Sequence, residues 1–173
     1  NNGIGSTGVC WVARVMILKD GDAIPQIAAT AASILYASQK GAVAFNISSS
    51  LGVVPSPTLQ AAVTAAQATG MMICVSAGNG GFDITGSGII PQTYTNPNML
   101  IVAGTDNDDL PATFTSFSPT IVHIAAPAVN IYCADNSNGY SYWDGTSFAA
   151  PLAAGCVALM KSWSSTATVL QIK

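Results

Sequence analysis

The chain has 173 residues, of which 50% are hydrophobic and 8% are charged, and its formal net charge is −3. A charged fraction this far below the roughly 25% of ordinary soluble domains leaves no basic surface for a phosphate backbone, so nucleic-acid binding is not expected. Disorder is not expected either, because disordered chains combine low hydrophobicity with high charge. The longest near-continuous apolar run, from Leu152 to Met160, is far shorter than the ~20 residues of a membrane-spanning helix, so we expect a globular domain without a transmembrane segment.

The first part of the chain alternates β-type runs with helical patterns, and glycines at positions 41 and 70 stand where two helices would end. In chain order, the predicted elements are a strand at residues 14–18, a helix at 23–39, a strand at 42–47, a helix that opens at 55–58 and runs to 68, and a strand at 71–76. This alternation predicts an α/β fold with parallel strands joined by right-handed crossovers.

The second part of the chain contains shorter β-type runs and one long apolar helix. The predicted elements are strands at residues 98–104, 121–125 and 129–133, a hairpin partner at 140–143 and a helix at 146–163. Because ligands gather outside the carboxyl ends of parallel strands, functional residues are expected in the loops at 46–52 and 76–81 and in the loop after residue 104.

The two ends of the chain carry no terminal signals. Residues 1–3 include no initiator Met and no signal-peptide pattern, and residues 167–173 read as a helix without a stop signal. We therefore expect one partial domain over residues 1–173, incomplete at both ends.

The four cysteines form no CxxC pair, so neither a zinc site nor a thioredoxin-like redox function is expected. Cys74 and Cys156 lie in apolar segments and are expected to be buried free thiols. A disulfide that involves Cys10 or Cys133 stays open.

The most informative motif is Gly-Thr-Ser-Phe-Ala-Ala-Pro, from Gly145 to Pro151. A serine at the start of a helix lies beside unpaired backbone N–H groups and the positive end of the helix dipole, which favour an oxyanion. The motif resembles the nucleophile segment of subtilisin-like serine peptidases, and this resemblance implies that Ser147 is the nucleophile, with Gly145 and Thr146 beside the substrate. The alternative is that Thr146 or Ser147 only caps a core helix. Pro151 is expected in the first turn, where a missing N–H costs nothing.

A second motif, Ser-Ala-Gly-Asn-Gly, follows the predicted strand at 71–76. It resembles the oxyanion segment of the same family, which implies that Asn79 donates a hydrogen bond to the developing oxyanion. Gly78 would let the substrate backbone come close. The alternative is an ordinary turn asparagine.

The resemblance extends over nearly all 173 residues, and it implies a three-layer subtilisin-like fold with a mostly parallel central sheet. It also implies that the catalytic Asp and His motifs lie upstream of Asn1. His123, the only histidine, is expected to be structural, and Asp144 a loop residue, because neither is placed to act as a base or to orient one.

The family binds an extended peptide beside a segment that commonly reads Ser-Leu-Gly. Here either Ser48, Ser49 and Ser50 or the stretch from Ser50 to Gly52 matches that segment. Residues 1–6 resemble a loop that supplies calcium ligands in many relatives, which implies Asn2 as a metal ligand. No cofactor is otherwise required.

We therefore expect a secreted serine endopeptidase of the extracellular space or secretory pathway, acting on peptides or proteins through an acyl-enzyme on Ser147. The Asp and His would come from a missing N-terminal part, as another chain or segment, and residues 1–173 alone would be inactive. The alternative is a non-catalytic subtilisin-like structural or interaction domain. A weaker third reading, an α/β-hydrolase esterase, would require a Gly-x-Ser-x-Gly elbow that this sequence lacks.

Overall fold

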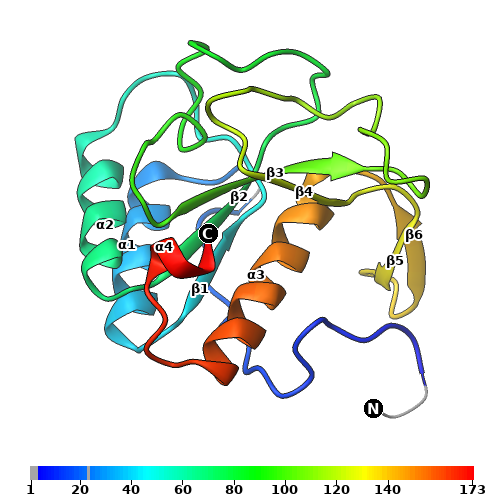
Figure 1. The fold of residues 1–173 in the computed structure, drawn as a ribbon, viewed down its shortest axis with the longest axis horizontal. Helices are drawn as coiled ribbons and strands as arrows, with labels where there is room; N and C mark the ends of the chain where they lie inside the picture. Colours follow the sequence, from blue (N-terminus) through cyan, green and yellow to red (C-terminus); the bar gives the residue numbers. More distant parts are fainter. Residues whose placement is uncertain (1–3, 23) are drawn as a thin grey trace.

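The computed structural model describes residues 4–22 and 24–173, and its central layer is a parallel sheet. The strands of this sheet, in the order in which they lie side by side, are β1 (Ala44–Ile47), β2 (Met72–Ser76), β3 (Met99–Thr105) and β4 (Ile124–Pro127). Helices α1 (Ile27–Gln39) and α2 (Pro57–Ala68) cover one face, and α3 (Thr146–Trp163) covers the other (Figure 1). The prediction of a three-layer α/β fold with a mostly parallel sheet is confirmed.

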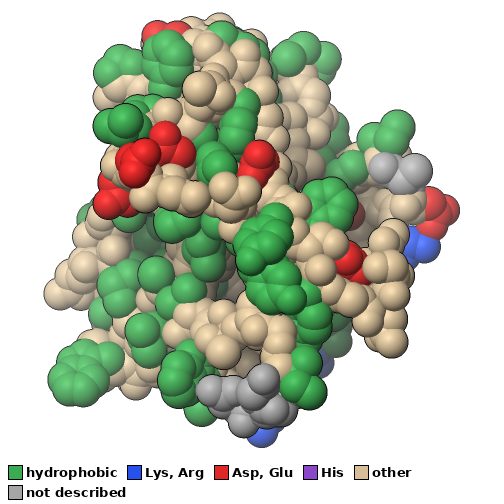
Figure 2. Space-filling view, turned by 90° about the vertical axis from the view of Figure 1, so that its right-hand side faces the viewer, with side chains coloured by type: hydrophobic (Ala, Val, Ile, Leu, Met, Phe, Trp, Pro, Cys, Tyr) green, Lys and Arg blue, Asp and Glu red, His purple; other side chains and the backbone are tan. Residues whose placement is uncertain are grey.

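A two-stranded antiparallel hairpin precedes α3 and consists of β5 (Ile131–Ala134) and β6 (Tyr140–Trp143). The exposed tyrosines of this hairpin pack against one another, with ring centroids 5.5 Å apart for Tyr132 and Tyr140 and 5.0 Å apart for Tyr132 and Tyr142. Figure 2 shows the side of the molecule to which the hairpin belongs, where hydrophobic side chains cover much of the surface and charged ones are few. The chain ends in a short helix, α4 (Val169–Ile172).

Two hydrophobic cores lie on the two faces of the sheet. One packs α1 and α2 against alternate residues of the strands, with Ile34, Leu59 and Ile73 fully buried. The other packs the small residues of α3 against the opposite face, with Ala149 and Ala150 fully buried beside Cys74. Because both faces are covered, β2 and β3 read as continuous apolar runs rather than as alternating patterns.

Glycines end α1 and α2 as predicted, and they also explain why two strands begin later than expected. Gly41 and Gly70 have φ values of 78° and 76°, in the left-handed region that favours glycine. The following N–H groups, of Ala42 and Met71, return to Ala37 and Ala66 within each helix. These residues belong to helix caps, so β1 and β2 begin at Ala44 and Met72.

The first predicted strand is wrong. Residues 14–18 pair with no strand in the described part of the chain, and Val15 and Ile17 are 80% and 87% exposed. A β-rich run has no independent stability without a partner for its backbone groups.

The helix predicted at 23–39 begins later, at Ile27. Pro25 disfavours helical geometry at Ile24, and the Gln26 N–H closes a turn onto the Asp20 carbonyl at 2.7 Å.

The last predicted strands are shifted toward the C-terminus. Ile121 and Val122 pack into the core beside α1 and α2 instead of pairing, and β4 begins at Ile124. Asn130 has a φ of 55°, which makes a turn and delays β5 to Ile131.

All four cysteines are free thiols, and the expectation that Cys156 is buried is wrong. Burial raises the pKa of Cys74 to about 12, with a smaller contribution from the nearby Cys156. The buried stripe of α3 consists of Thr146, Ala149, Ala150, Ala153 and Val157, and Cys156 lies off it and is exposed. Among the described residues, no helix is both long and apolar enough to cross a lipid bilayer.

Candidate active site

The carboxyl ends of β1 and β2 and the first turn of α3 meet at one end of the sheet. The loop after β1 contains Ser48, the loop after β2 contains Asn79, and Ser147 is the second residue of α3. Hydrogen bonds join both loops to the start of α3, although these segments are far apart in the sequence. The structure thus brings together the two motifs that the sequence singled out.

Asn79 holds the start of α3 through its side-chain oxygen. Its Oδ1 accepts hydrogen bonds from the Thr146 backbone N–H at 2.9 Å and from the Thr146 hydroxyl at 2.7 Å. The Thr146 hydroxyl accepts in turn from the Gly78 N–H at 3.2 Å. These two hydrogen bonds orient the side-chain amide with Oδ1 toward Thr146. The Nδ2 group has no acceptor among the described residues and stays available as a donor.

Ser147 faces the loop after β1. Its Oγ donates to the Ser48 carbonyl at 3.2 Å, and the Ser48 hydroxyl donates to the Ser147 carbonyl at 2.8 Å. Asn46, which the sequence analysis did not single out, donates from Nδ2 to the Ser48 hydroxyl at 3.0 Å. The cap of α3 is Gly145 without a side-chain cap hydrogen bond, so the reading of Thr146 or Ser147 as a helix cap is wrong.

Pro151 lies inside α3, and its expected place in the first turn is wrong. It is the sixth residue of the helix. Any other residue at this position would donate its backbone N–H to the carbonyl four residues earlier, that of Ser147, but proline has no N–H. That carbonyl accepts the Ser48 hydroxyl instead. The proline therefore frees a backbone acceptor that ties Ser147 to the loop after β1.

Two hydrogen-bond donors at the start of α3 have no acceptor among the described residues. The Ser147 backbone N–H is in the first turn of α3, where helical partners are missing, and no acceptor for it occurs among residues 4–22 and 24–173. The Nδ2 of Asn79 comes within 3.2 Å of where a Cβ on Gly145 would lie, and Gly145 has a φ of 145°. A side chain at Gly145 would therefore meet both a strained backbone and the Asn79 amide.

The two candidate peptide-binding stretches after β1 differ in their backbone pairing. Leu51 N–H donates to the Ile90 carbonyl at 2.8 Å, and Ile90 N–H donates to the Gly52 carbonyl at 2.9 Å. Leu51 and Gly52 are thus already paired, whereas Ser48 contacts Ser147 directly. This geometry favours Ser48 to Ser50 over Ser50 to Gly52 as the stretch that faces a substrate.

Neither His123 nor Asp144 is hydrogen-bonded to Ser147 in the described part of the chain. His123 directly precedes β4, at the amino end of the sheet, and its Nδ1 accepts from the Ile101 N–H at 3.0 Å. Burial, followed by the charge of Lys173, lowers the pKa of His123 to about 4. Asp144 is an exposed loop residue whose Oδ1 accepts from the Asn130 N–H at 2.8 Å. Both residues are structural, as expected.

The expected calcium ligand, Asn2, lies outside the described residues. Within residues 4–22 and 24–173, no group of three or more His, Cys, Asp or Glu side chains could hold a metal ion.

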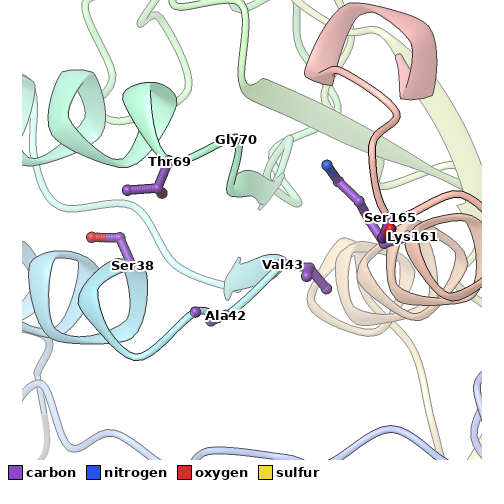
Figure 3. A pocket seen from close by; sticks show the side chains of 8 residues that line it. Ser38, Ala42, Val43, Thr69, Gly70, Lys161 and Ser165 are labelled. Atoms are coloured by element: carbon purple, nitrogen blue, oxygen red, sulfur yellow. The ribbon is translucent and has the colours of Figure 1, made fainter.

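A small cavity of about 170 Å³ lies at the opposite end of the sheet, near the amino ends of β1 and β2. Figure 3 shows Ser38 and Thr69 on one side of it and Lys161 on the other. The Lys161 ammonium donates to the Ala167 carbonyl at 2.5 Å. The cavity is separate from the Ser147 site, and its lining offers no nucleophile paired with a base.

The fold and this site define an α/β protein with a helix-borne serine at the carboxyl ends of parallel strands. The model of the subtilase family matches residues 1–173, and the chain belongs to this family. It is 33% identical over 165 residues to a thermophilic serine proteinase of Bacillus sp. (strain AK1), covering 94% of this chain and 39% of that protein. It is 32% identical over 172 residues to subtilisin Savinase of Lederbergia lenta, covering 95% of this chain and 61% of that protein.

Solved structures agree with this assignment of the fold. A protease from Pseudoalteromonas arctica matches with a TM-score of 0.85 at 26% identity, over 99% of this chain and 57% of that one. A cold adapted subtilisin-like serine proteinase matches with a TM-score of 0.75 at 26% identity, over 86% of this chain and 53% of that one. The chain therefore spans between about two fifths and three fifths of the length of these relatives.

Proposed function

We propose that the protein is a serine endopeptidase that hydrolyses peptide bonds through an acyl-enzyme on Ser147. The observation that carries the proposal is the convergence of Ser147 and the Asn79 amide at one end of the sheet, through the contact of Asn79 with Thr146. Membership of the subtilase family supports the same reaction class. Peptide hydrolysis by this route requires no cofactor.

In this reaction the Ser147 hydroxyl attacks the scissile carbonyl. The Asn79 Nδ2 and the Ser147 N–H would then donate to the oxyanion of the tetrahedral intermediate, where preorganised donors lower the barrier most. The hydroxyl must give up its hydrogen bond to the Ser48 carbonyl before it attacks, because its proton has to pass to a base.

The base and the carboxylate that orients it would come from residues outside 1–173, either in the same polypeptide or in another chain. A serine hydroxyl without a base is a weak nucleophile near neutral pH. His123 cannot fill this role, because it lies at the other end of the sheet with its Nδ1 occupied. Residues 1–173 alone are therefore expected to be inactive.

The substrate would be an extended peptide or protein segment that lies beside Ser48, Ser49 and Ser50. Gly78 and Gly145 border the same site and would leave room for the substrate backbone, whereas Thr146 is buried and would act through its hydrogen bonds to Asn79 and Gly78. Low charge together with family membership supports action outside the cell or in the secretory pathway. A calcium ion bound through Asn2 is a separate proposal, tested by whether EDTA lowers the Tm of the full-length protein.

The test of the proposed function uses the full-length protein and a set of chromogenic peptides. We expect cleavage by the wild type, no cleavage by Ser147→Ala, and no cleavage by residues 1–173 alone. Ser162→Ala is a matched control, because Ser162 lies on the same helix and its hydroxyl donates to the Leu159 carbonyl within its own helix. Equal cleavage by the wild type and Ser147→Ala would reject the proposal.

No observation favours the alternative of a non-catalytic domain. The esterase reading also lacks support, because Ser147 follows the β5–β6 hairpin instead of a strand of the parallel sheet.

A further inference from the structure

Gln92 is a fully buried amide that bridges two loops of the candidate site. Its side-chain Nε2 donates to the Ser76 carbonyl at 2.9 Å, to the Ser50 hydroxyl at 3.1 Å and to the Ser49 carbonyl at 3.4 Å. Ser76 is the last residue of β2, and Ser49 and Ser50 lie in the loop after β1. One side chain thus links the loop that contacts Ser147 to the strand end that leads to Asn79.

The Gln92 side chain takes the place of strand pairing where the pairing between β1 and β2 ends. The last pair between β1 and β2 joins Ile47 to Val75, so Ser76 has no neighbour in β1. The Ala77 N–H donates to Val102 of β3, and across the same planar peptide group the Ser76 carbonyl points toward the β1 side. The Gln92 amide occupies this position and supplies the missing donor.

The segment that carries Gln92 is itself attached to the far end of the same loop. Ile90 exchanges backbone hydrogen bonds with Leu51 and Gly52, as described above. The loop after β1 is therefore held at both ends, by Ser48 on Ser147 and by Leu51 and Gly52 on Ile90, with Gln92 fixing its middle.

Burying the Gln92 amide is energetically unfavourable, and the hydrogen bonds of its Nε2 to Ser49, Ser50 and Ser76 offset this cost. The Gln92 Oε1 is buried without a hydrogen-bond partner in the described part of the chain. An unsatisfied buried acceptor is unfavourable, and an apolar side chain would avoid it but would leave the Ser76 carbonyl unpaired. The residue therefore fits a positioning role better than a packing role.

We infer that Gln92 is a positioning residue that holds the peptide-binding stretch Ser48 to Ser50 in register with Ser147 and Asn79. This inference rests on the proposed function, because the stretch must receive an extended substrate. Loss of the amide should weaken binding of long peptides while leaving the reacting groups in place, since Gln92 is bonded to neither Ser147 nor Asn79.

The test compares an extended peptide with a small activated ester, which does not reach the loop, on the full-length enzyme. For Gln92→Leu we expect KM for the peptide to rise about tenfold, with hydrolysis of the ester within about twofold of the wild type. Gln60→Leu is the matched control, because Gln60 is a partly buried glutamine on α2 that donates to Asn96 Oδ1. Unchanged peptide KM, or equal losses on both substrates, would overturn the inference.

Two further variants keep the inference testable if Gln92→Leu does not fold. Gln92→Glu keeps the shape, but its carboxyl donates only when protonated, so its peptide KM relative to wild type should rise with pH. Ser50→Ala removes one acceptor of the Gln92 amide and should raise peptide KM by about twofold to threefold. A pH-independent KM ratio for Gln92→Glu together with a wild-type KM for Ser50→Ala would overturn the inference.

A readout without turnover separates this inference from the proposed function. Hydrogen exchange of the backbone over residues 48–52 should be faster in Gln92→Leu or Gln92→Glu than in the wild type and unchanged in Gln60→Leu. A wild type that cleaves neither substrate would reject the proposed function. In that case, unchanged exchange in the Gln92 variants would reject the positioning role, and faster exchange would show that Gln92 holds the loop.

Discussion

Ser48 and Ser147 exchange two hydrogen bonds, although 99 positions separate them in the sequence. Each hydroxyl donates to the backbone carbonyl of the other residue, so the loop after β1 and the first turn of α3 fix one another. Pro151 makes one of these bonds possible, because it has no N–H to occupy the Ser147 carbonyl. The candidate nucleophile is thus positioned by backbone groups that the helix itself leaves free.

The bond between the Ser48 hydroxyl and the Ser147 carbonyl should depend on Pro151. Ser48→Ala is expected to lower the free energy of unfolding by about 1 kcal/mol, because the partly buried carbonyl loses its donor. In a Pro151→Ala background, the new helical N–H supplies a replacement donor and the loss should shrink. A double-mutant cycle by urea unfolding measures this coupling, and equal losses in both backgrounds would show that Pro151 has no such role.

Asn79 has two separable roles, which different substitutions should divide. Asn79→Asp keeps the acceptor for Thr146 but loses the Nδ2 donor, so stability should change little. Its kcat should fall about 10²-fold to 10³-fold, a range taken from subtilisin, a member of this family. Asn79→Leu removes both groups and should also lower the free energy of unfolding by about 1 kcal/mol. Peptide kinetics and urea unfolding check both variants, and a loss of stability without loss of kcat in either would leave Asn79 only a structural role.

His123 should make stability depend on pH. Its pKa is about 4 in the folded chain, against an ordinary value of 6.5, so the unfolded chain binds more protons between these values. The contribution of His123 to stability is fully present above pH 6.5 and is lost as the pH falls toward 4. Because the imidazole is partly exposed, we expect a loss of about 1 kcal/mol after solvent screening.

His123→Gln removes this titration and should flatten the stability curve between pH 7 and pH 4 relative to wild type. Chemical unfolding at a series of pH values measures the difference. Parallel curves for the two proteins would mean that the histidine titrates normally in the folded state.

The cysteines of α3 and β2 should differ sharply in reactivity. Burial raises the pKa of Cys74 to about 12, whereas Cys156 is exposed. Since the thiolate is the reactive form, a thiol reagent should modify Cys156 in the native protein and Cys74 only after unfolding. Mass spectrometry of chymotryptic peptides after timed labelling checks this order, and rapid native modification of Cys74 would contradict the burial.

The parts of the fold that the sequence predicts well are those that local chemistry decides. The long apolar run after Gly145 predicts α3 at residues 146–163, as observed. The glycines at positions 41 and 70 predict the ends of α1 and α2, because only residues that tolerate positive φ fit there. The run at 14–18 fails as a strand because β structure depends on a partner, which local sequence does not reveal.

The candidate site likewise contains residues that local sequence predicts and residues that only the structure reveals. Ser147 and Asn79 stand in compact motifs that a family resemblance can locate. The choice between Ser48 and the Leu51–Gly52 pair depends on Ile90, some forty residues later, and no local pattern signals that pairing. Gln92 reads as an ordinary residue after a proline, and only its contacts with Ser49, Ser50 and Ser76 distinguish it.

The most direct test of the account is to label the intact, folded full-length protein with a fluorophosphonate and to locate the adduct by mass spectrometry. The account predicts one stoichiometric adduct on Ser147, which is absent from Ser147→Ala and strongly slowed in Asn79→Leu. A folded wild-type protein that forms no adduct at Ser147, or forms it at another serine, would contradict the assignment of Ser147 as the nucleophile.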